Sequence, residues 1–396
     1  MKIAVVGGGP AGLRAAEVAA AAGAEVDVFD AMPSVGRKLL VAGRGGLNLT
    51  HGEDFENFIT RYSGPGQPPD FWRRALENFP PTKLREWAAG LGIETFEQRT
   101  GRVYPREMKA APLLRRWVER LKAAGVRFHM RRRLERIGTG PPLRLGFADA
   151  TEEFEADALI LALGGGSWPV TGSNGGWVSL LQGMGIGVNP LLPANCGWES
   201  TWPIGVLKIA EGAPLKNIAV RAGDVEVKGE LMVTAYGLEG GAIYQLGHVL
   251  RAMDQPAITI DFKPESTVED LARKMESARG DLTEICRSRW KLSVAAHAIL
   301  THGLPKDTTL ETLCRLTKSS PVRLIQARPI AEAISSAGGV RWNEIDEALM
   351  LKKFPGIFVA GEMIDWEAPT GGYLMQGCFA SGQLAAEGAV SRFKQG

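Results

Sequence analysis

The first thirty residues of this 396-residue chain constrain its fold most strongly. An apolar, β-branched run over residues 2–6 predicts a strand, an Ala-rich run over 10–22 predicts a helix, and residues 25–29 predict a second strand. Asp30 follows the second strand directly. This succession of strand, helix, strand and acidic residue is typical of a Rossmann unit.

Three glycines at G-x-G-x-x-G spacing connect the first strand to the helix. Gly7 allows a sharp turn, Gly9 lets the backbone approach a pyrophosphate, and Gly12 lets the helix pack closely on the sheet. The helix N-terminus offers N–H groups and the positive end of its dipole to phosphates. Asp30 lies eighteen residues after Gly12, where its carboxylate can accept hydrogen bonds from ribose hydroxyls. We therefore predict a dinucleotide site, and the alternative is a Gly-rich turn that binds no ligand.

Composition limits the class of protein. A hydrophobic content of 45% with 23% charged residues predicts a globular protein with a large core, and the length predicts two or three domains. The net charge of +2 argues against an obligatory polyanionic partner. None of the apolar runs reaches roughly 20 residues, the length that spans a bilayer, so we expect no membrane partner. Because the glycine fingerprint begins so early, we expect no signal peptide and a cytoplasmic protein.

The cysteines are dispersed, at Cys196, Cys286, Cys314 and Cys378, and include no C-x-x-C pair. This spacing argues against a zinc ribbon and against an adjacent redox disulfide. We therefore expect reduced core cysteines and no metal site.

Residues 32–51 contain too many glycines to predict one helix or strand. We expect a loop that runs under a bound cofactor, with Arg37 or Lys38 near its phosphates or its redox ring. An ordinary surface loop is the alternative. His51, at the end of this segment, is a candidate catalyst, but a lone histidine is more often a structural hydrogen-bonding residue.

A continuous apolar run over residues 158–163 predicts a buried strand of a parallel sheet. It runs into three glycines, and ligands of open α/β sheets collect at such strand ends. Before this strand, four basic residues cluster at Arg131, Arg132, Arg133 and Arg136. Because aromatic residues do not alternate with them, these arginines predict a solvated face or a cofactor rim rather than a nucleic-acid surface.

The composition changes near Asn189 and returns to its opening character near residue 350. Short β-rich runs between these points predict an antiparallel sheet or small barrel, and one stretch has helical periodicity. The simplest architecture is a nucleotide-binding domain built from both chain ends, with two inserted parts. We assign residues 1–189 and 350–396 to the first domain, 190–264 and 321–349 to a β-rich substrate domain, and 265–320 to a helical subdomain.

Three further segments carry recognisable motifs. Residues 36–51 are G-R-K-L-L-V-A-G-R-G-G-L-N-L-T-H, residues 162–175 are A-L-G-G-G-S-W-P-V-T-G-S-N-G, and residues 360–376 are A-G-E-M-I-D-W-E-A-P-T-G-G-Y-L-M-Q. Together they resemble a bacterial FAD flavoprotein family that includes aminoacetone oxidase and the BaiN-type bile-acid reductases, a group of NAD(P)/FAD-dependent oxidoreductases. The resemblance spans nearly the whole chain, and its last motif is the most specific.

The resemblance implies an α/β fold, with a Rossmann-like FAD-binding domain and an inserted β-barrel and helical subdomain. Residues 133–134 would lie against adenine through their backbone, and Glu362 and Asp365 would approach the ribityl and phosphate region. Residues 372–375 would open the last helix and stabilise negative charge at the pyrimidine edge of reduced flavin. The expected FAD contacts are Gly7, Gly9, Pro10, Ala11, Gly12, Asp30, Ala31, Arg37, Lys38, Leu39, Arg44, Gly45, Asn48, Arg133, Leu134, Ala162, Leu163, Gly164, Gly165, Gly361, Glu362, Asp365, Gly371, Gly372, Tyr373, Leu374 and Met375.

This chain departs from the family pattern at three places, which predicts a divergent subfamily. The family's Arg-Cys pair is here Gly46-Leu47, so cysteine chemistry beside the flavin is not expected, and Arg44 is a candidate to replace the lost charge. Gly176 stands where the family has an aspartate, and Leu374 stands where it has an asparagine. These changes bear on the substrate more than on the cofactor.

By resemblance we expect an FAD-dependent oxidoreductase that transfers a hydride between a small-molecule substrate and flavin N5. Amine oxidation and enone reduction both remain open, as do O2 and transiently bound NAD(P)H as electron partners. Candidate catalytic residues near the flavin are Lys38, Asn48, His51 and Tyr373. Tyr236, Glu239 and Tyr244 belong to an inserted segment that could face the substrate.

Two other functions are kept as alternatives. One is a flavin-binding redox sensor or partner-docking module without turnover. The other is FAD-dependent RNA modification, whose only support in the sequence is the arginine cluster. The sequence argues against a nucleic-acid partner and makes no prediction of the oligomeric state.

Overall fold

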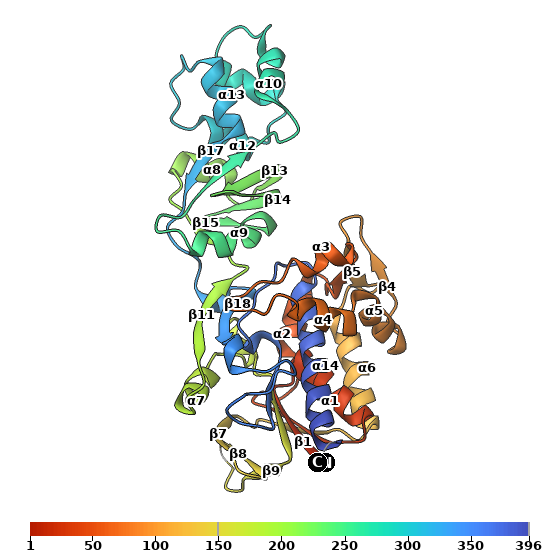
Figure 1. The fold of residues 1–396 in the computed structure, drawn as a ribbon. Coiled ribbons are helices and arrows are strands. Elements are labelled where there is room, and N and C mark those ends of the chain that lie inside the picture. The colour runs from red at the N-terminus through yellow and green to blue at the C-terminus, as the bar shows by residue number, and fades with distance from the viewer. Residues whose placement is uncertain (149, 395–396) are drawn as a thin grey trace. The chain divides into compact units, whose positions relative to one another are not determined.

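The computed structural model describes residues 1–148 and 150–394, without the side chains of Arg44, Phe393 and Lys394. The chain forms two compact units, each with its own contacts. The first unit combines Met1–Leu192 with Ile334–Gly396, and the second is Pro193–Ala333. The first unit is therefore built from both ends of the chain (Figure 1).

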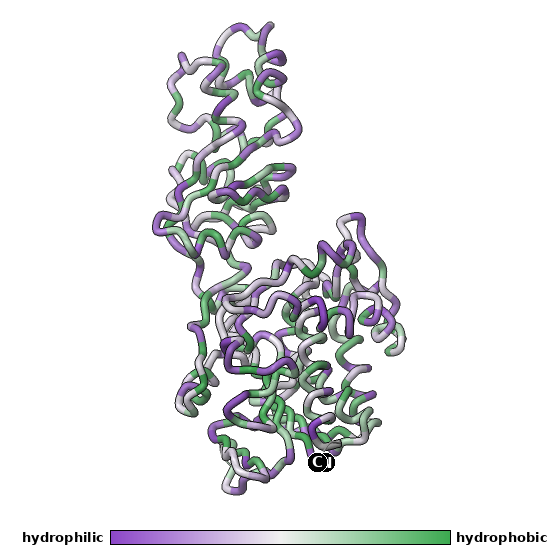
Figure 2. Tube along the Cα trace, in the orientation of Figure 1, coloured by the Kyte–Doolittle hydropathy of each residue, from purple (hydrophilic) through white to green (hydrophobic). Residues whose placement is uncertain are grey.

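A five-stranded parallel sheet forms the centre of the first unit. Its strands, in spatial order, are β19 (Ile357–Val359), β10 (Ala158–Leu161), β1 (Lys2–Val6), β2 (Glu25–Asp30) and β6 (Arg127–Met130). Val5 of β1 is level with Val28 on one side and Ile160 on the other, and all three side chains are buried. Such apolar strands suit a sheet that is covered on both faces (Figure 2).

Helix α1 (Pro10–Ala21) packs along α14 (Tyr373–Lys394), so the first and last helices lie together (Figure 1). Small side chains allow this close approach, because a Cβ at Gly382 would clash with the backbone of Ala11. Helix α6 (Ala110–Ala123) also belongs to this unit and buries Leu113 and Trp117.

The other elements of the first unit are short. Three small sheets have the orders β3-β5-β4, β7-β8-β9 and β11-β18. The strands are β3 (Thr50–His51), β4 (Thr95–Glu97), β5 (Arg102–Pro105), β7 (Leu134–Gly138), β8 (Leu143–Phe147), β9 (Phe154–Ala156), β11 (Val188–Ala194, which crosses the unit boundary) and β18 (Ser335–Val340). The helices and 3-10 turns are α2 (Arg37–Ala42), η1 (Gly43–Gly45), α3 (Phe55–Ile59), α4 (Phe71–Asn78), α5 (Pro81–Gly90), η2 (Pro169–Thr171), α7 (Trp177–Gly183), η4 (Trp342–Glu344) and η5 (Gly361–Met363).

The prediction of a simple loop over residues 32–51 was wrong, because six of these residues form helix α2. The glycines lie outside the helix rather than within it. Gly36 precedes it with a left-handed φ of 69°, which allows the sharp entry, and Gly43 ends it. The intervening run of Arg37 to Ala42 contains no glycine and is free to form a helical turn and a half.

The second unit is built on a six-stranded antiparallel sheet. The strands are, in spatial order, β12 (Trp198–Glu199), β15 (Gly237–Glu239), β14 (Val225–Thr234), β13 (Pro214–Ala222), β16 (Ala257–Asp261) and β17 (Ser320–Arg323). The sheet curls back on itself, since Ile325, just after β17, donates its N–H to the carbonyl oxygen of Glu199 in β12 at 2.8 Å. The helices and the 3-10 turn here are α8 (Ile204–Ala210), α9 (Gly241–Arg251), α10 (Val268–Met275), α11 (Leu282–Arg289), α12 (Val294–Thr301), α13 (Leu310–Lys318) and η3 (Ile330–Glu332).

These two units confirm the expected fold class, an α/β protein with a Rossmann-like sheet and an inserted, curled antiparallel sheet. The boundaries differ from our assignment, because residues 334–349 belong to the first unit. Strand β18 is buried along its whole length, and Val340 accepts the N–H of Asp365 at 3.0 Å, which ties it to the first unit. Helices α10 to α13 occupy residues 265–320, and their status as a separate subdomain stays a prediction.

Two negative findings apply to the described residues. None of the helices between residues 1 and 394 is long and apolar enough to cross a membrane. None of the four cysteines forms a disulfide, and Cys286 and Cys314 are buried.

Candidate functional site

A cavity of about 490 Å³ opens where strands β1, β2 and β10 end. Parallel strands present their carboxyl ends at one edge, which is where ligands of this sheet type bind. Eleven of the residues expected at FAD line this cavity: Gly7, Gly9, Asp30, Ala31, Arg37, Lys38, Arg133, Leu134, Ala162, Leu163 and Gly164.

The three glycines of the fingerprint differ in what their missing side chains allow. Gly7 has a φ of 111°, and a Cβ there would clash with the carbonyl oxygen of Ala162. A Cβ at Gly12 would clash with the carbonyl oxygen of Gly7. At Gly9, by contrast, a Cβ would meet nothing within 4 Å and would project into open space at the cavity wall. Gly7 and Gly12 therefore serve the fold, and Gly9 leaves room for a ligand.

Asp30 is held at the cavity wall by two backbone N–H groups. Gly8 donates to one carboxylate oxygen at 2.9 Å and Met32 donates to the other at 2.8 Å. Burial raises the pKa of Asp30 above its usual value, although these bonds and the nearby Arg37 oppose the rise. Each carboxylate oxygen keeps a lone pair that can accept a hydrogen bond from a hydroxyl group.

Lys38 lies where two cavities meet, because it lines both of them. Its Nζ donates to Ser167 Oγ at 2.6 Å and to Glu362 Oε2 at 2.8 Å. Glu362 is fixed in turn by the N–H of Ser336, which donates to Oε1 at 2.9 Å. Helix α2 thus places the ammonium group of Lys38 between the first cavity and a second one.

The second cavity, of about 520 Å³, has mostly apolar walls. They come from α2, the segment around Leu47, Trp168, Ile334 and the start of α14. Among the described residues that line it, none is an aspartate or a glutamate. Its lining residues that we expected at FAD are Lys38, Asn48, Gly371, Gly372, Leu374 and Met375.

The first turn of α14 forms part of this second wall. Gly371 and Gly372 precede the helix with φ of 129° and 100°, and a Cβ at Gly372 would press against the backbone of Thr50. The first N–H groups of a helix have no acceptor within the helix, and they carry the positive end of its dipole. The cavity therefore has one electropositive end within an apolar surface.

Two buried polar atoms at these cavities have no hydrogen-bond partner among the described residues. One is Nε of Arg37 at the first cavity, and the other is Oδ1 of Asn48 at the second. A buried polar atom without a partner is costly, and a bound ligand is one way to satisfy it.

Several expected FAD contacts do not line either cavity: Pro10, Ala11, Gly12, Leu39, Gly45, Gly165, Gly361, Glu362, Asp365 and Tyr373. Glu362 reaches the site through Lys38. The Asp365 carboxylate is instead buried and accepts from Nδ2 of Asn189 at 2.5 Å, and burial raises its pKa. The side chain of Arg44 lies outside the described part of the structure.

Two candidate catalysts also point elsewhere. Tyr373 donates its hydroxyl to Glu53 Oε1 at 2.5 Å. His51 lines neither cavity, and its Nε2 lies 2.9 Å from the carbonyl oxygen of Thr100. Lys38 and Asn48 are the candidates that the structure brings to the second cavity.

The sequence missed a wall of the first cavity formed by η2 and α7. Ser173 Oγ donates to the carbonyl oxygen of Gly165 at 2.6 Å, and Trp177 Nε1 donates to that of Gly164 at 2.8 Å. These bonds hold the segment over the strand ends. The G-S-N-G run at 172–175 was a signal for it. Gly8, Trp168, Pro369 and Thr370 also lie within the quoted motifs, although they were not predicted to line the site, whereas Ile334 lies in none of them.

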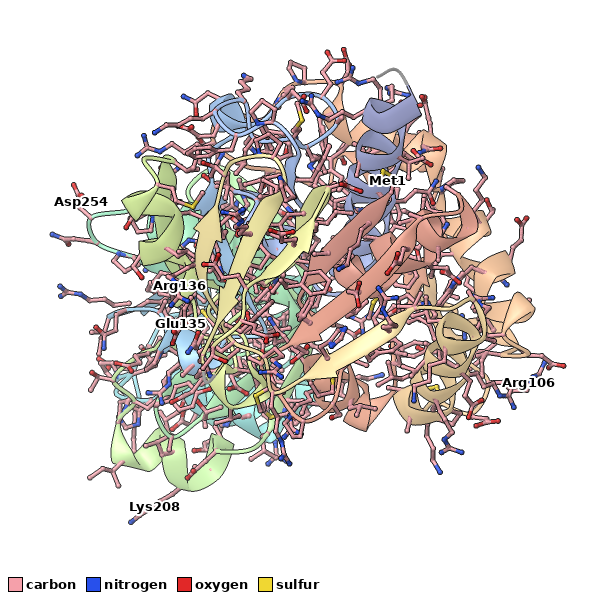
Figure 3. The ribbon with its side chains drawn as sticks, turned by 90° about the horizontal axis from the view of Figure 1, so that it is seen from below. Met1, Arg106, Glu135, Arg136, Lys208 and Asp254 are labelled. Atoms are coloured by element: carbon pink, nitrogen blue, oxygen red, sulfur yellow. The ribbon has the colours of Figure 1, made fainter. Side chains whose placement is uncertain are left out.

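The arginine cluster lies partly at the rim of the first cavity. Arg132 and Arg133 line it, and the N–H of Arg132 donates to the carbonyl oxygen of Asp30 at 2.8 Å. Glu135 of β7 lines it as well and is labelled with Arg136 in Figure 3. A cofactor rim, one of the two interpretations we favoured, accounts for this placement.

In the second unit, Tyr236 donates its hydroxyl to Glu239, and the guanidinium of Arg328 lies over the Tyr236 ring at 4.4 Å. Burial raises the pKa of nearby Tyr244 to about 12, and the charge of Glu239 adds to the rise. Neither of the two cavities described above is lined by these residues.

Comparison with known proteins agrees with the Rossmann-like fold of the first unit. The family described as HI0933-like protein Rossmann domain matches residues 1–388. A 3-dehydro-bile acid delta(4,6)-reductase of Clostridium scindens is 28% identical over 99% of both chains. Ribosomal RNA dihydrouridine synthases of Haemophilus influenzae and Escherichia coli are 22% and 24% identical, over at least 96% of each chain.

Among solved structures, the 3-ketosteroid-delta4-(5alpha)-dehydrogenase of Rhodococcus jostii RHA1 superposes with a TM-score of 0.55. It is 16% identical, with 98% of this chain and 96% of that chain covered. The 3-ketosteroid delta1-dehydrogenase of Sterolibacterium denitrificans gives 0.53 at 13% identity, with 98% and 99% covered. At these identities the likeness shows a shared fold.

Proposed function

This chain belongs to the HI0933-like family of FAD-binding Rossmann oxidoreductases, and we propose that it reduces a carbon–carbon double bond conjugated to a carbonyl group. The proposed substrate is a flat, apolar small molecule. The observation that carries this proposal is the second cavity, with apolar walls, one lysine, one buried amide and no acidic lining residue among those described.

The residues present fit FAD. Gly9 opens onto the first cavity, and Arg37 Nε and Asn48 Oδ1 are buried without partners where a ligand would contact them. The α1 N-terminus would hold the pyrophosphate and Asp30 the ribose, while the first turn of α14 would face the pyrimidine edge of the ring. When bound, FAD supplies a two-electron carrier that exchanges a hydride at N5.

The lining of the second cavity argues for a neutral carbonyl substrate over an amine. An ammonium group entering an apolar pocket needs a carboxylate partner, and Glu362, the acidic residue that contacts the lining Lys38, is already paired with it. A carbonyl oxygen needs a donor instead, and the third N–H of Lys38 or the amide of Asn48 can supply one. Such a donor draws electrons from the conjugated system, so the β-carbon would accept a hydride and the α-carbon would take a proton from water.

The bile-acid reductase relative supports this choice, because its name describes reduction of double bonds in a ring system that carries an oxo group. Two other relatives favour a second candidate function, reduction of uridine in RNA. The chemistry would be similar, since the double bond of uracil is also conjugated to a carbonyl. The two candidates differ in substrate size and in the need for phosphate contacts.

A single anaerobic experiment separates these candidates. The purified protein is loaded with FAD. One portion is reduced with NADH or NADPH and mixed with a cyclic enone or a uridine-containing RNA, and another is left oxidised and mixed with a primary amine. We expect the enone to reoxidise the flavin and yield the saturated ketone. Reoxidation by RNA alone, with salt-sensitive binding lost when Arg131 to Arg133 are neutralised, would favour the second candidate.

Lys38→Met provides the matched variant for this experiment. Loss of the donor should lower the rate of enone reduction at least tenfold, whereas Lys352→Met, on the exposed surface, should leave it unchanged. Reduction of the oxidised flavin by an amine would contradict the proposed direction. A flavoprotein that turns over none of these compounds would support a sensor or docking module.

A further inference from the structure

We infer that Glu53 is a positioning residue that fixes the first turn of α14 through the side chain of Tyr373. This inference rests on the proposed function, because the N–H groups of that turn would face the pyrimidine edge of FAD. Glu53 itself lines neither cavity and would not contact the cofactor.

The turn is held by residues that do not line the second cavity. Leu374 and Met375 line that cavity, while Tyr373 is buried and directs its hydroxyl to Glu53 Oε1 at 2.5 Å. The carbonyl oxygen of Tyr373 also accepts the hydroxyl of Tyr62 at 2.8 Å. Tyr373 is therefore an anchor for the helix end rather than a group that reaches a substrate.

Glu53 is in turn held in place. Arg61 donates to both of its carboxylate oxygens, from Nε at 3.0 Å and from Nη2 at 2.6 Å. The N–H of Glu53 donates to His51 Nδ1 at 3.2 Å, and the His51 ring stacks on Tyr373 with centroids 5.3 Å apart. Because the carboxylate is restrained by Arg61, it transmits a fixed position to the Tyr373 hydroxyl.

The two residues before Tyr373 cannot restrain the first turn of α14 through a side chain. Gly371 and Gly372 have no side chains, and both adopt left-handed φ values that glycine reaches with little strain. Tyr373 is thus the first residue of the helix whose side chain can restrain the turn. Without its bond to Glu53, the di-glycine segment could let the N–H groups shift within the wall of the cavity.

A shift of these N–H groups would change the flavin more than the fold. Fixed donors at the pyrimidine edge favour the reduced form, which carries more negative charge there, over the oxidised form. Loss of the anchor should therefore lower the midpoint potential while FAD stays bound.

The test uses Tyr373→Phe, which keeps the stacked ring, and Glu53→Gln, which keeps the shape of the carboxylate. Hydrogen exchange of the Gln376 N–H, which donates to the carbonyl oxygen of Gly372 at 3.0 Å and so closes the first turn of α14, is measured without FAD. The two-electron midpoint potential is measured with FAD bound. We expect faster exchange in both variants and at least a tenfold loss of preference for reduced over oxidised FAD, which equals about 30 mV. Glu56→Gln, which breaks an exposed pair with Arg73, is the control and should change neither quantity.

Each outcome decides the inference. Unchanged exchange in Tyr373→Phe and Glu53→Gln would overturn the anchor, and faster exchange with an unchanged potential would overturn its link to the flavin. If the unmodified protein binds no FAD, the proposed function fails instead, while the exchange data still report on the anchor. Should one variant fail to fold, the other tests the same hydrogen bond from its opposite end.

Discussion

The absence of a side chain at Gly9 leaves space for a ligand in the first cavity. A Cβ at this residue would meet no protein atom within 4 Å, so the fold tolerates a larger residue that the ligand would not. We expect Gly9→Val to fold normally but to weaken FAD binding at least a hundredfold, because the side chain would occupy the place of the pyrophosphate. Titration of the apoprotein with FAD measures the effect.

Gly183→Val is the control for this substitution. Gly183 ends α7, and a Cβ there also meets nothing within 4 Å, but the residue does not line the first cavity. Its FAD affinity should match that of the unmodified protein. Normal flavin retention in Gly9→Val would refute the role assigned to this glycine.

Asp30 should make FAD binding pH-dependent. Burial raises its pKa above 3.8 in the protein without ligand, so the group takes up a proton as the pH falls toward that raised value. Ribose hydroxyls donate to the carboxylate, so the protonated form binds less tightly and affinity should fall by up to tenfold per pH unit in that range.

Isothermal titration between pH 7 and the lowest pH at which the protein stays folded measures this dependence. Asp30→Asn should bind FAD weakly at pH 7 and lose most of the pH dependence. An affinity that is flat with pH in the unmodified protein would argue against an ionised Asp30 at the ribose.

At the scale of elements, strand β6 is joined to β2 by a buried charge. Asp27 is 1% exposed, and it accepts from Arg127 at 2.8 and 2.6 Å and lies 2.7 Å from His129 Nε2. Burial alone would raise the pKa of Asp27, but the bonds from Arg127 and His129 outweigh it and leave the pKa below its usual value. The ionised carboxylate therefore stabilises the edge of the sheet.

We expect Asp27→Asn to lower the free energy of unfolding at pH 7 by about 1–3 kcal/mol. We expect a value of about 1 kcal/mol, because Arg127 is half exposed and its guanidinium can hydrogen-bond to water when the carboxylate is lost. The pKa of Asp27 is lower in the folded protein than in the unfolded chain. Its contribution to the free energy of unfolding is therefore complete above the unfolded pKa near 3.8 and is lost as the pH falls through the folded pKa. Urea denaturation at pH 7 and in acid measures the difference, and an equal difference at both would contradict the assignment.

At the scale of the whole molecule, each unit has its own buried core. The first core includes Trp117 and Trp366, and the second includes Trp290 and Phe262. FAD would contact residues of the first unit alone, because both cavities of the site are lined by that unit. Ligand binding should therefore stabilise one core and not the other.

Differential scanning calorimetry tests this expectation. We predict two transitions, and FAD should raise the midpoint temperature of only one of them. The free energy of unfolding of that unit should rise by about 2.7 kcal/mol at an FAD concentration 100 times the Kd. Phosphate-free buffer without FAD is the reference. A single transition that shifts as a whole would show that the two units unfold together.

The sequence by itself determined the Rossmann unit, the fold class and the family. Strand β1, helix α1 and strand β2 begin within one residue of their expected positions, because periodicity and glycine spacing are local properties. The T-G-G-Y motif at residues 370–373 correctly indicated where the last helix starts. Helix α2 was missed, because a short run between glycines carries too little periodic signal.

Only the tertiary structure decided which side chains meet at the site. Lys38 and Glu362 are 324 positions apart and pair because α2 and η5 lie at the same edge of the sheet. Tyr373 belongs to the most specific motif, yet packing turns its side chain toward Glu53 and away from the cavity. Motif spacing locates a backbone turn, but the direction of each side chain is set by the elements packed around it, and this separates the residues that line the site from those that hold it.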